Sequence, residues 1–336
     1  MRRLKKKELR ASVCYSLVVL LVAYVASWAV FTLGVYLQDY IPVLSHPVAS
    51  QIYNMLIYTA QLLCPVFYWF VLTGKGFCDI FRVRTEEDLP EDTEKNTVLS
   101  ILSWFLVAFS LSQIMAIVSD IFSRTVSAFL SELSPIFVLD EEAFALPHYE
   151  GICGLILQLV ATAVLPAILE ELLFRGVFLS QFLKYGKTFA IVMSSFLFAS
   201  VHGSIQQMMY SFVFGLIFGY IAVKSGSLTA GMIIHFLNNA YGCVADYLQE
   251  ILDAGLFEDI LTVSNFILIF AGLAVVFHKI RFNGIGYSEK CDSDRDEGEL
   301  KGMEIYSVFL SFPMILYYIL IIGETLYTYI SYNLGT

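Results

Sequence analysis

Long apolar runs alternate with short polar segments along most of this 336-residue chain. The runs are long enough to cross a hydrocarbon core about 30 Å thick, which takes roughly 20 helical residues. They lack the alternating pattern of barrel strands, and an open sheet cannot cross lipid, so they predict helices. The chain is therefore expected to be an all-α, polytopic bundle of about eight or nine membrane spans. The runs cover residues 13–36, 50–73, 98–122, 150–183, 188–203, 205–223, 228–245, 257–278 and 304–330.

The positions of lysine and arginine test this span count. With a cytoplasmic N-terminus and nine crossings, the cytoplasmic segments carry 18 of the 20 Lys and Arg residues. The opposite side carries Arg124, and Arg175 lies inside a span. Because positive residues concentrate in cytoplasmic loops, this distribution favours nine crossings with the N-terminus inside. The first apolar run is too long for the core of a signal peptide, so a retained first span is predicted.

The composition agrees with a membrane protein and excludes several other classes. Apolar residues make up 58% of the chain and charged residues 15%, and the mean hydropathy is +0.72. Soluble domains are roughly 45–50% apolar and about 25% charged. A soluble domain, a disordered chain and a nucleic-acid binder with a basic face are therefore excluded, and the lipid bilayer is the first expected partner. The six cysteines show no C-x-x-C spacing, so neither a disulfide framework nor a thiolate metal site is predicted.

Polar interruptions divide the chain into regions. Residues 83–97 and 286–302 are charged enough to be solvated cytoplasmic loops. The outer segment 123–149 has apolar residues at helical spacing, which favours an amphipathic helix on the membrane surface. Three regions are predicted: an N-terminal membrane region with three spans at 1–149, a core at 150–245, and C-terminal spans with a charged loop at 246–336.

Ionisable and amide side chains inside the spans are concentrated in the core region. A charge in the middle of a span costs at least about 2.5–3.5 kcal/mol, so such a residue indicates function by default. Glu324, late in the last run, is expected to lie in water near the outer interface instead. The polar residues of the core spans are Glu170, Glu171, Arg175, His202, His235, Asn238 and Asn239.

Helical spacing predicts which of these side chains meet. Residues four apart lie on the same helix face, which predicts a Glu171–Arg175 ion pair. The same spacing places His235 beside Asn239, and Phe198 one turn below His202.

Proline predicts an irregularity in the fourth run. Pro166 lacks the N–H that would bond to the carbonyl of Thr162, so that carbonyl is freed and the helix bends. A kink near Pro166 or Gly176 would also open space for water around the carboxylates.

These groups have the chemistry needed for hydrolysis. A poorly solvated carboxylate, Glu170 or Glu171, can take a proton from water, and His202 can share that proton or orient the water. The oxyanion that forms during amide cleavage needs donors, which an imidazole and the Asn239 amide can supply.

Three motifs carry a resemblance to a known family. Glu170-Glu171-Leu-Leu-Phe-Arg175 has the pattern EExxxR, Phe198-Ala-Ser-Val-His202 has FxxxH, and His235-Phe-Leu-Asn-Asn239 has HxxxN. In this order and inside predicted spans, they resemble the CPBP family of intramembrane proteases. This family is also called CAAX-protease, bacteriocin-processing or Abi, and is related to the Ras-converting CAAX endopeptidase. The resemblance covers about residues 150–245.

The resemblance implies a role for each motif residue. Glu170 would activate water with the help of His202, and His235 and Asn239 would form the oxyanion site. Glu171 and Arg175 would hold the geometry of the fourth span, with Phe198 as packing support. The metal question stays open: catalysis without a cofactor is favoured because Asn239 suits hydrogen bonding and H-E-x-x-H is absent, but Glu170, His202 and His235 are also a zinc set.

The implied function is an intramembrane endopeptidase that acts on a membrane-associated peptide or protein, either prenylated or carrying a leader. Two other classes remain open, namely a non-catalytic scaffold or bacteriocin self-immunity protein, and a transporter. A transporter would show inverted repeats, which the sequence does not suggest. The expected location is a bacterial plasma membrane.

Overall fold

The chain folds into helices throughout the part that the structure, a computed structural model, describes. The described residues are 2–38, 40–41, 46–74, 77–81, 83, 97–134, 136, 138–140, 150–283 and 312–335. The predicted loop at 286–302 and nearly all of the loop at 83–97 lie outside them. The helices are α1 (Arg2–Gln38), α2 (Pro47–Thr73), η2 (Phe77–Phe81), α3 (Val98–Leu133), α4 (Gly151–Gln158), η6 (Leu159–Val164), α5 (Leu165–Glu170), η7 (Glu171–Leu179), α6 (Ser180–Phe182), η8 (Leu183–Tyr185), α7 (Lys187–Ser200), α8 (Ile205–Ser225), α9 (Thr229–Ile251), α10 (Ala254–His278), η9 (Lys279–Asn283) and α12 (Phe312–Leu334).

The polytopic helical architecture predicted from the apolar runs is confirmed. Within the described residues, each of the nine runs coincides wholly or in part with a helix or a helical series, and seven of these are long and apolar enough to cross a membrane. The other two are α7 and α9. Helix α7 has 14 residues, about 21 Å at 1.5 Å per residue, which is shorter than the hydrocarbon core. Helix α9 has 23 residues but carries a polar face that includes His235 and Asn239.

The fourth run is one continuous helical series in which the α-helical winding is interrupted by two π-helical segments. These segments, η6 and η7, flank the six-residue α-helix α5. The irregularity therefore lies on both sides of Pro166 and extends through Gly176. Because π-helical insertions in α-helices frequently occur at functional sites, this winding draws attention to Glu170, the last residue of α5, and Glu171, the first of η7.

The outer segment differs from the prediction. An amphipathic helix on the membrane surface was expected within residues 123–149, but residues 123–133 continue α3 as one helix of 36 residues. Residues 135, 137 and 141–149 lie outside the described residues. The chain leaves the helical conformation at Ser134, which has extended backbone angles.

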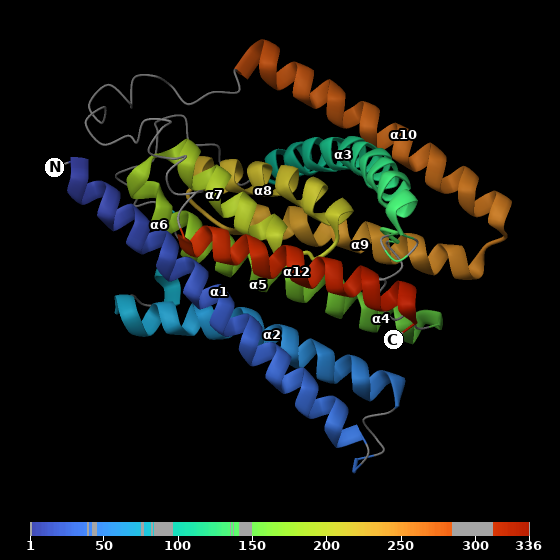
Figure 1. Cartoon of the computed structure of the whole chain (residues 1–336). Helices are drawn as coiled ribbons and strands as arrows, with labels where there is room; N and C mark the ends of the chain where they lie inside the picture. The colour runs from blue at the N-terminus through green and yellow to red at the C-terminus, as the bar shows by residue number, and fades with distance from the viewer. Residues whose placement is uncertain are drawn as a thin grey trace.

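The helices form one bundle, which includes the N-terminal helices α1 and α2 and the C-terminal helix α12. Figure 1 shows α3 and α10 lying side by side at one edge and α1 and α2 crossing at the opposite edge. Helix α12 runs through the middle of the view and packs on α1. A hydrogen bond from Thr325 Oγ1 to the Gly203 carbonyl, 2.7 Å long, ties α12 to the turn between α7 and α8. The C-terminal helix therefore contacts the core region directly.

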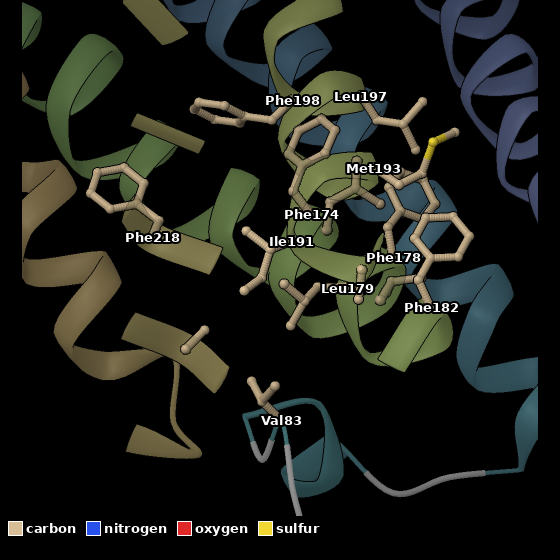
Figure 2. Packing of buried hydrophobic residues seen from close by; sticks show 14 of the residues in the cluster. Val83, Phe174, Phe178, Leu179, Phe182, Ile191, Met193, Leu197, Phe198 and Phe218 are labelled. Atoms are coloured by element: carbon tan, nitrogen blue, oxygen red, sulfur yellow. The ribbon is translucent and has the colours of Figure 1, made fainter. Parts of the chain in front are cut away.

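One buried apolar cluster lies beneath the polar residues of the core region. It is built largely by η7, α7 and α8, and Figure 2 shows Phe174 between Phe198 and Phe178. Phe174 and Phe198 meet edge to face with their ring centroids 5.3 Å apart. Gly215 lets α8 approach α7 closely, because a Cβ atom there would lie 2.8 Å from the Cα of Ser195. This close packing holds the segments that carry the three motifs in fixed relation.

Candidate functional site

A cavity of about 500 Å³ brings residues from all three motifs together. Glu170 comes from α5, His202 from the turn after α7, and His235 and Asn239 from α9. Segments more than 60 residues apart in sequence therefore line one space. Phe198 also lines the cavity, whereas Glu171 and Arg175 lie behind it in the protein interior.

Glu170 is buried and has one oxygen without a hydrogen-bond partner. The hydroxyl of Tyr58, on α2, donates to Glu170 Oε1 at 2.5 Å. The other oxygen, Oε2, accepts no hydrogen bond within the described part of the chain and lies 3.7 Å from His235 Nε2. Tyr58 thus fixes the carboxylate through one oxygen and leaves the second oxygen available to a small molecule in the cavity.

His202 is presented to the cavity by a tight turn. Gly203 has φ of +76°, a left-handed conformation that favours glycine, and the Ser204 hydroxyl caps α8 by accepting from the Gln207 amide. Nδ1 of His202 lies 2.9 Å from the Phe198 carbonyl. A carbonyl can only accept, so Nδ1 carries a proton, and Nε2 of the neutral ring is a free acceptor.

Glu171 and Arg175 form the ion pair predicted from their spacing. Arg175 Nη1 lies 2.8 Å from Glu171 Oε1, and both side chains are fully buried. The guanidinium also stacks over the Phe198 ring, 4.3 Å from its centroid. Phe198 therefore contacts the buried cation as well as lining the cavity, which gives its place in the FxxxH pattern a physical reason.

His235 lies between the two carboxylates of the first motif. Its Nδ1 is 3.5 Å from Glu171 Oε1, and its Nε2 is the atom that faces Glu170. The ring stacks on Phe218 at 5.3 Å between centroids. Each ring nitrogen of His235 therefore faces one carboxylate of the first motif.

Asn239 is oriented by two contacts. Its Nδ2 donates to the Thr162 carbonyl at 2.9 Å, and this is the carbonyl that Pro166 cannot engage. Asn238 Nδ2 lies 3.3 Å from Asn239 Oδ1 and holds the amide from the other end. An amide nitrogen has two hydrogens, so one remains for a ligand in the cavity.

One residue of the site was missed by the sequence reasoning. Tyr58 lies 112 residues before Glu170, in an apolar run that holds no ionisable Asp, Glu, Lys, Arg or His to single it out. Glu324 was expected to lie in water near the outer interface, and this stays a prediction. The structure places it on the apolar helix α12, where it lines a second cavity beside the site.

The described residues also bear on metal binding. Among them, no three His, Cys, Asp or Glu side chains are grouped in a way that would hold a metal ion. The possible zinc set of Glu170, His202 and His235 lines the cavity, but His202 already uses Nδ1 for the Phe198 carbonyl. Only its Nε2 would be available as a ligand.

The fold and the site define a polytopic helical membrane protein with a buried carboxylate, two imidazoles and an amide around one cavity. Residues 152–241 match the model of a family described as type II CAAX prenyl endopeptidase Rce1-like. This match confirms the resemblance based on the three motifs and, at the level of the family, supports a CAAX-type intramembrane protease. No curated protein and no solved structure matches the chain.

Proposed function

We propose that this protein is an intramembrane endopeptidase in which Glu170 activates water to hydrolyse a peptide bond. The observation that carries the proposal is the state of Glu170. One oxygen of this buried carboxylate is held by Tyr58, and the other has no hydrogen-bond partner in the described chain. A carboxylate held in this way can take a proton from a water molecule in the cavity.

The proposed reaction has two proton transfers. Glu170 removes a proton from water as the water oxygen bonds to the carbonyl carbon of the scissile peptide, and Nε2 of His202 accepts the other hydrogen of that water in a hydrogen bond. The carbonyl oxygen becomes an oxyanion. The proton on Glu170 then passes to the peptide nitrogen as the carbon–nitrogen bond breaks, which releases an amine and a carboxylic acid.

His235 and Asn239 are proposed to stabilise the oxyanion. His235 can donate from a ring nitrogen, and Asn239 has one amide hydrogen besides that bound to Thr162. Preorganised donors in a water-poor site stabilise developing charge strongly, and removing one typically slows acyl transfer about 10²–10³-fold. Glu171 and Arg175 do not reach the cavity, so their proposed role is to hold the π-helical segment η7 in place.

The proposed substrates are membrane-associated peptides or proteins, prenylated or carrying a leader. An almost wholly apolar cavity of about 500 Å³ lies between α7, α8 and α12, and it could hold a lipid chain of the substrate. We further propose a cytoplasmic N-terminus, on the basis of the charge distribution, in a bacterial plasma membrane. The three-region division at 1–149, 150–245 and 246–336 also stays a prediction.

A Glu170→Gln variant tests the proposal. The wild-type protein in liposomes is expected to cleave fluorogenic peptides ending in C-a-a-X, farnesylated or not, or a leader peptide. Glu170→Gln should lower kcat/KM about 10²–10⁴-fold, the usual contribution of a general base. Glu258→Gln, an exposed glutamate on α10, is the matched control and should cleave normally.

Two outcomes would contradict the proposal. Cleavage by Glu170→Gln at the wild-type rate would exclude the assigned mechanism. If the wild type cleaves none of these peptides, and Glu170→Gln and His235→Ala proteins still complement a deletion strain, the non-catalytic scaffold or self-immunity alternative is favoured instead.

A further inference from the structure

A second cavity, of about 300 Å³, adjoins the candidate active site on the side of α1 and α12. It shares Tyr58, Glu170 and His202 with the first cavity, so these three residues form the boundary between the two spaces. Its far wall includes Glu324 from α12 and Tyr24 from α1. Part of a substrate bound at Glu170 can therefore extend into the second cavity.

Glu324 is a carboxylate on the apolar helix α12, which is long enough to span a membrane. Its side chain accepts a hydrogen bond from Tyr24, and no Lys or Arg is among the described residues that line the cavity around it. A carboxylate inside a membrane span costs at least about 2.5–3.5 kcal/mol unless it is hydrated or paired, and such residues mark substrate or ion sites. The missing partner points to a group that comes from outside.

The second cavity carries negative charge on two sides. Glu170 and Glu324 both line it, and none of its described lining residues is Lys or Arg. Arg175, the nearest buried cation to Glu170 in the helix, is already paired with Glu171. A basic side chain entering this cavity would meet two carboxylates, and the apolar residues of the cavity, among them Leu20, Leu62 and Leu320, can cover its methylene stem.

The wall of the second cavity that carries Glu324 is fixed against the turn that carries His202. Thr325 donates to the Gly203 carbonyl, next to His202, and the hydroxyls of Tyr317 and Ser200 lie 2.6 Å apart. These contacts fix α12 against the residues on either side of His202. A group bound at Glu324 would thus have a defined position relative to the scissile bond.

We infer that the second cavity is a subsite for a lysine or arginine side chain of the substrate, with Glu324 as its counter-ion. This inference rests on the proposed function and names a feature of its substrates. Its counter-ion Glu324 and the wall contributed by α1, α2 and α12 lie outside residues 152–241, the segment that matches the family. That part of the subsite is therefore not described by the family match.

A peptide series measures the preference directly. The probes are farnesylated C-a-a-X peptides that differ only in carrying lysine or the uncharged norleucine at each position flanking the prenyl-cysteine. At one of these flanking positions, the wild-type kcat/KM for the lysine peptide should be about tenfold higher than that for the norleucine peptide. Glu324→Gln should bring that lysine-to-norleucine ratio to about one, and Glu324→Lys should bring it below one.

The ratio does not depend on how much of a variant folds, and Thr328→Ala, one turn further along α12 and outside the cavity, should keep the wild-type ratio. An unchanged ratio in Glu324→Gln, or no lysine preference at any position, would overturn the inference while leaving the protease proposal intact. If the wild type cleaves no peptide, the protease proposal fails. Binding of the same peptides to wild type and Glu324→Gln, followed by fluorescence anisotropy, then decides on the subsite alone.

Discussion

The buried Glu171–Arg175 pair allows a quantitative prediction about stability. In Arg175→Met the guanidinium is lost, and the Glu171 carboxylate stays in the interior with His235 Nδ1 3.5 Å from its Oε1. Removing one partner of a buried pair typically costs about 3–5 kcal/mol because the remaining charge is uncompensated. Arg175→Met also loses the cation–π contact with Phe198. We expect the free energy of unfolding to fall by about 3–5 kcal/mol.

The double variant Glu171→Met/Arg175→Met separates the charge effect from packing. Replacing both members of a buried pair by apolar residues of similar size is often neutral or stabilising, because neither charge has to be desolvated. The double variant should therefore recover most of the stability that Arg175→Met loses. Its core keeps long side chains at both positions against Phe198 and Phe218.

The matched control is an exposed pair with the same spacing. Arg124 Nε and Asp120 Oδ2 lie 2.9 Å apart on α3, and the Arg124 side chain is 80% exposed. Exposed pairs contribute about 0–1 kcal/mol, so Arg124→Met should have little effect. All variants can be unfolded in mixed micelles with increasing SDS and followed by tryptophan fluorescence. Equal stability of Arg175→Met and Arg124→Met, or a double variant no more stable than Arg175→Met, would refute the reasoning.

Three further predictions concern the site and its scaffold. Tyr58→Phe removes a hydrogen bond to a charged group, worth about 1.5–3 kcal/mol, so kcat/KM should fall about 10- to 100-fold. Tyr68→Phe on the same helix is its control, and equal activity of the two would exclude a role for the hydroxyl. Gly215→Ala should lower the unfolding free energy by about 1–3 kcal/mol, because its Cβ would overlap the Ser195 backbone; wild-type stability would show that α7 and α8 can separate without cost. Cleavage should persist after treatment with 1,10-phenanthroline, whereas loss of activity that zinc restores would favour the zinc-dependent alternative.

Local spacing explains why much of the candidate site could be predicted from sequence. Two side chains four residues apart on a helix meet whatever the rest of the fold does, so the Glu171–Arg175 pair followed from the sequence alone. The missing N–H of Pro166 likewise predicted a free carbonyl at Thr162. Which group would bond to that carbonyl could not be predicted, since Asn239 comes from a helix 77 residues away.

The error arose where the apolar pattern alone had to decide an element's limits. Hydropathy could not tell that residues 123–133 continue α3, because an amphipathic helix and the end of a long span have the same spacing. Helix α9 shows that hydropathy is also lowered by function. Its polar face turns toward the cavity, and this lowers its mean hydropathy below that of a lipid-exposed span.

The sequence by itself determined that this is an all-helical membrane protein and which residues carry its polar chemistry. Both follow from local causes: lipid requires the backbone to satisfy its own hydrogen bonds, and each charge inside a span is costly enough to stand out. Only the tertiary structure decided that Tyr58 holds Glu170 and that Glu324 shares a cavity with it. Those contacts depend on how α2 and α12 pack against α5 and α7, and that packing rests on many weak apolar contacts that no short stretch of sequence specifies.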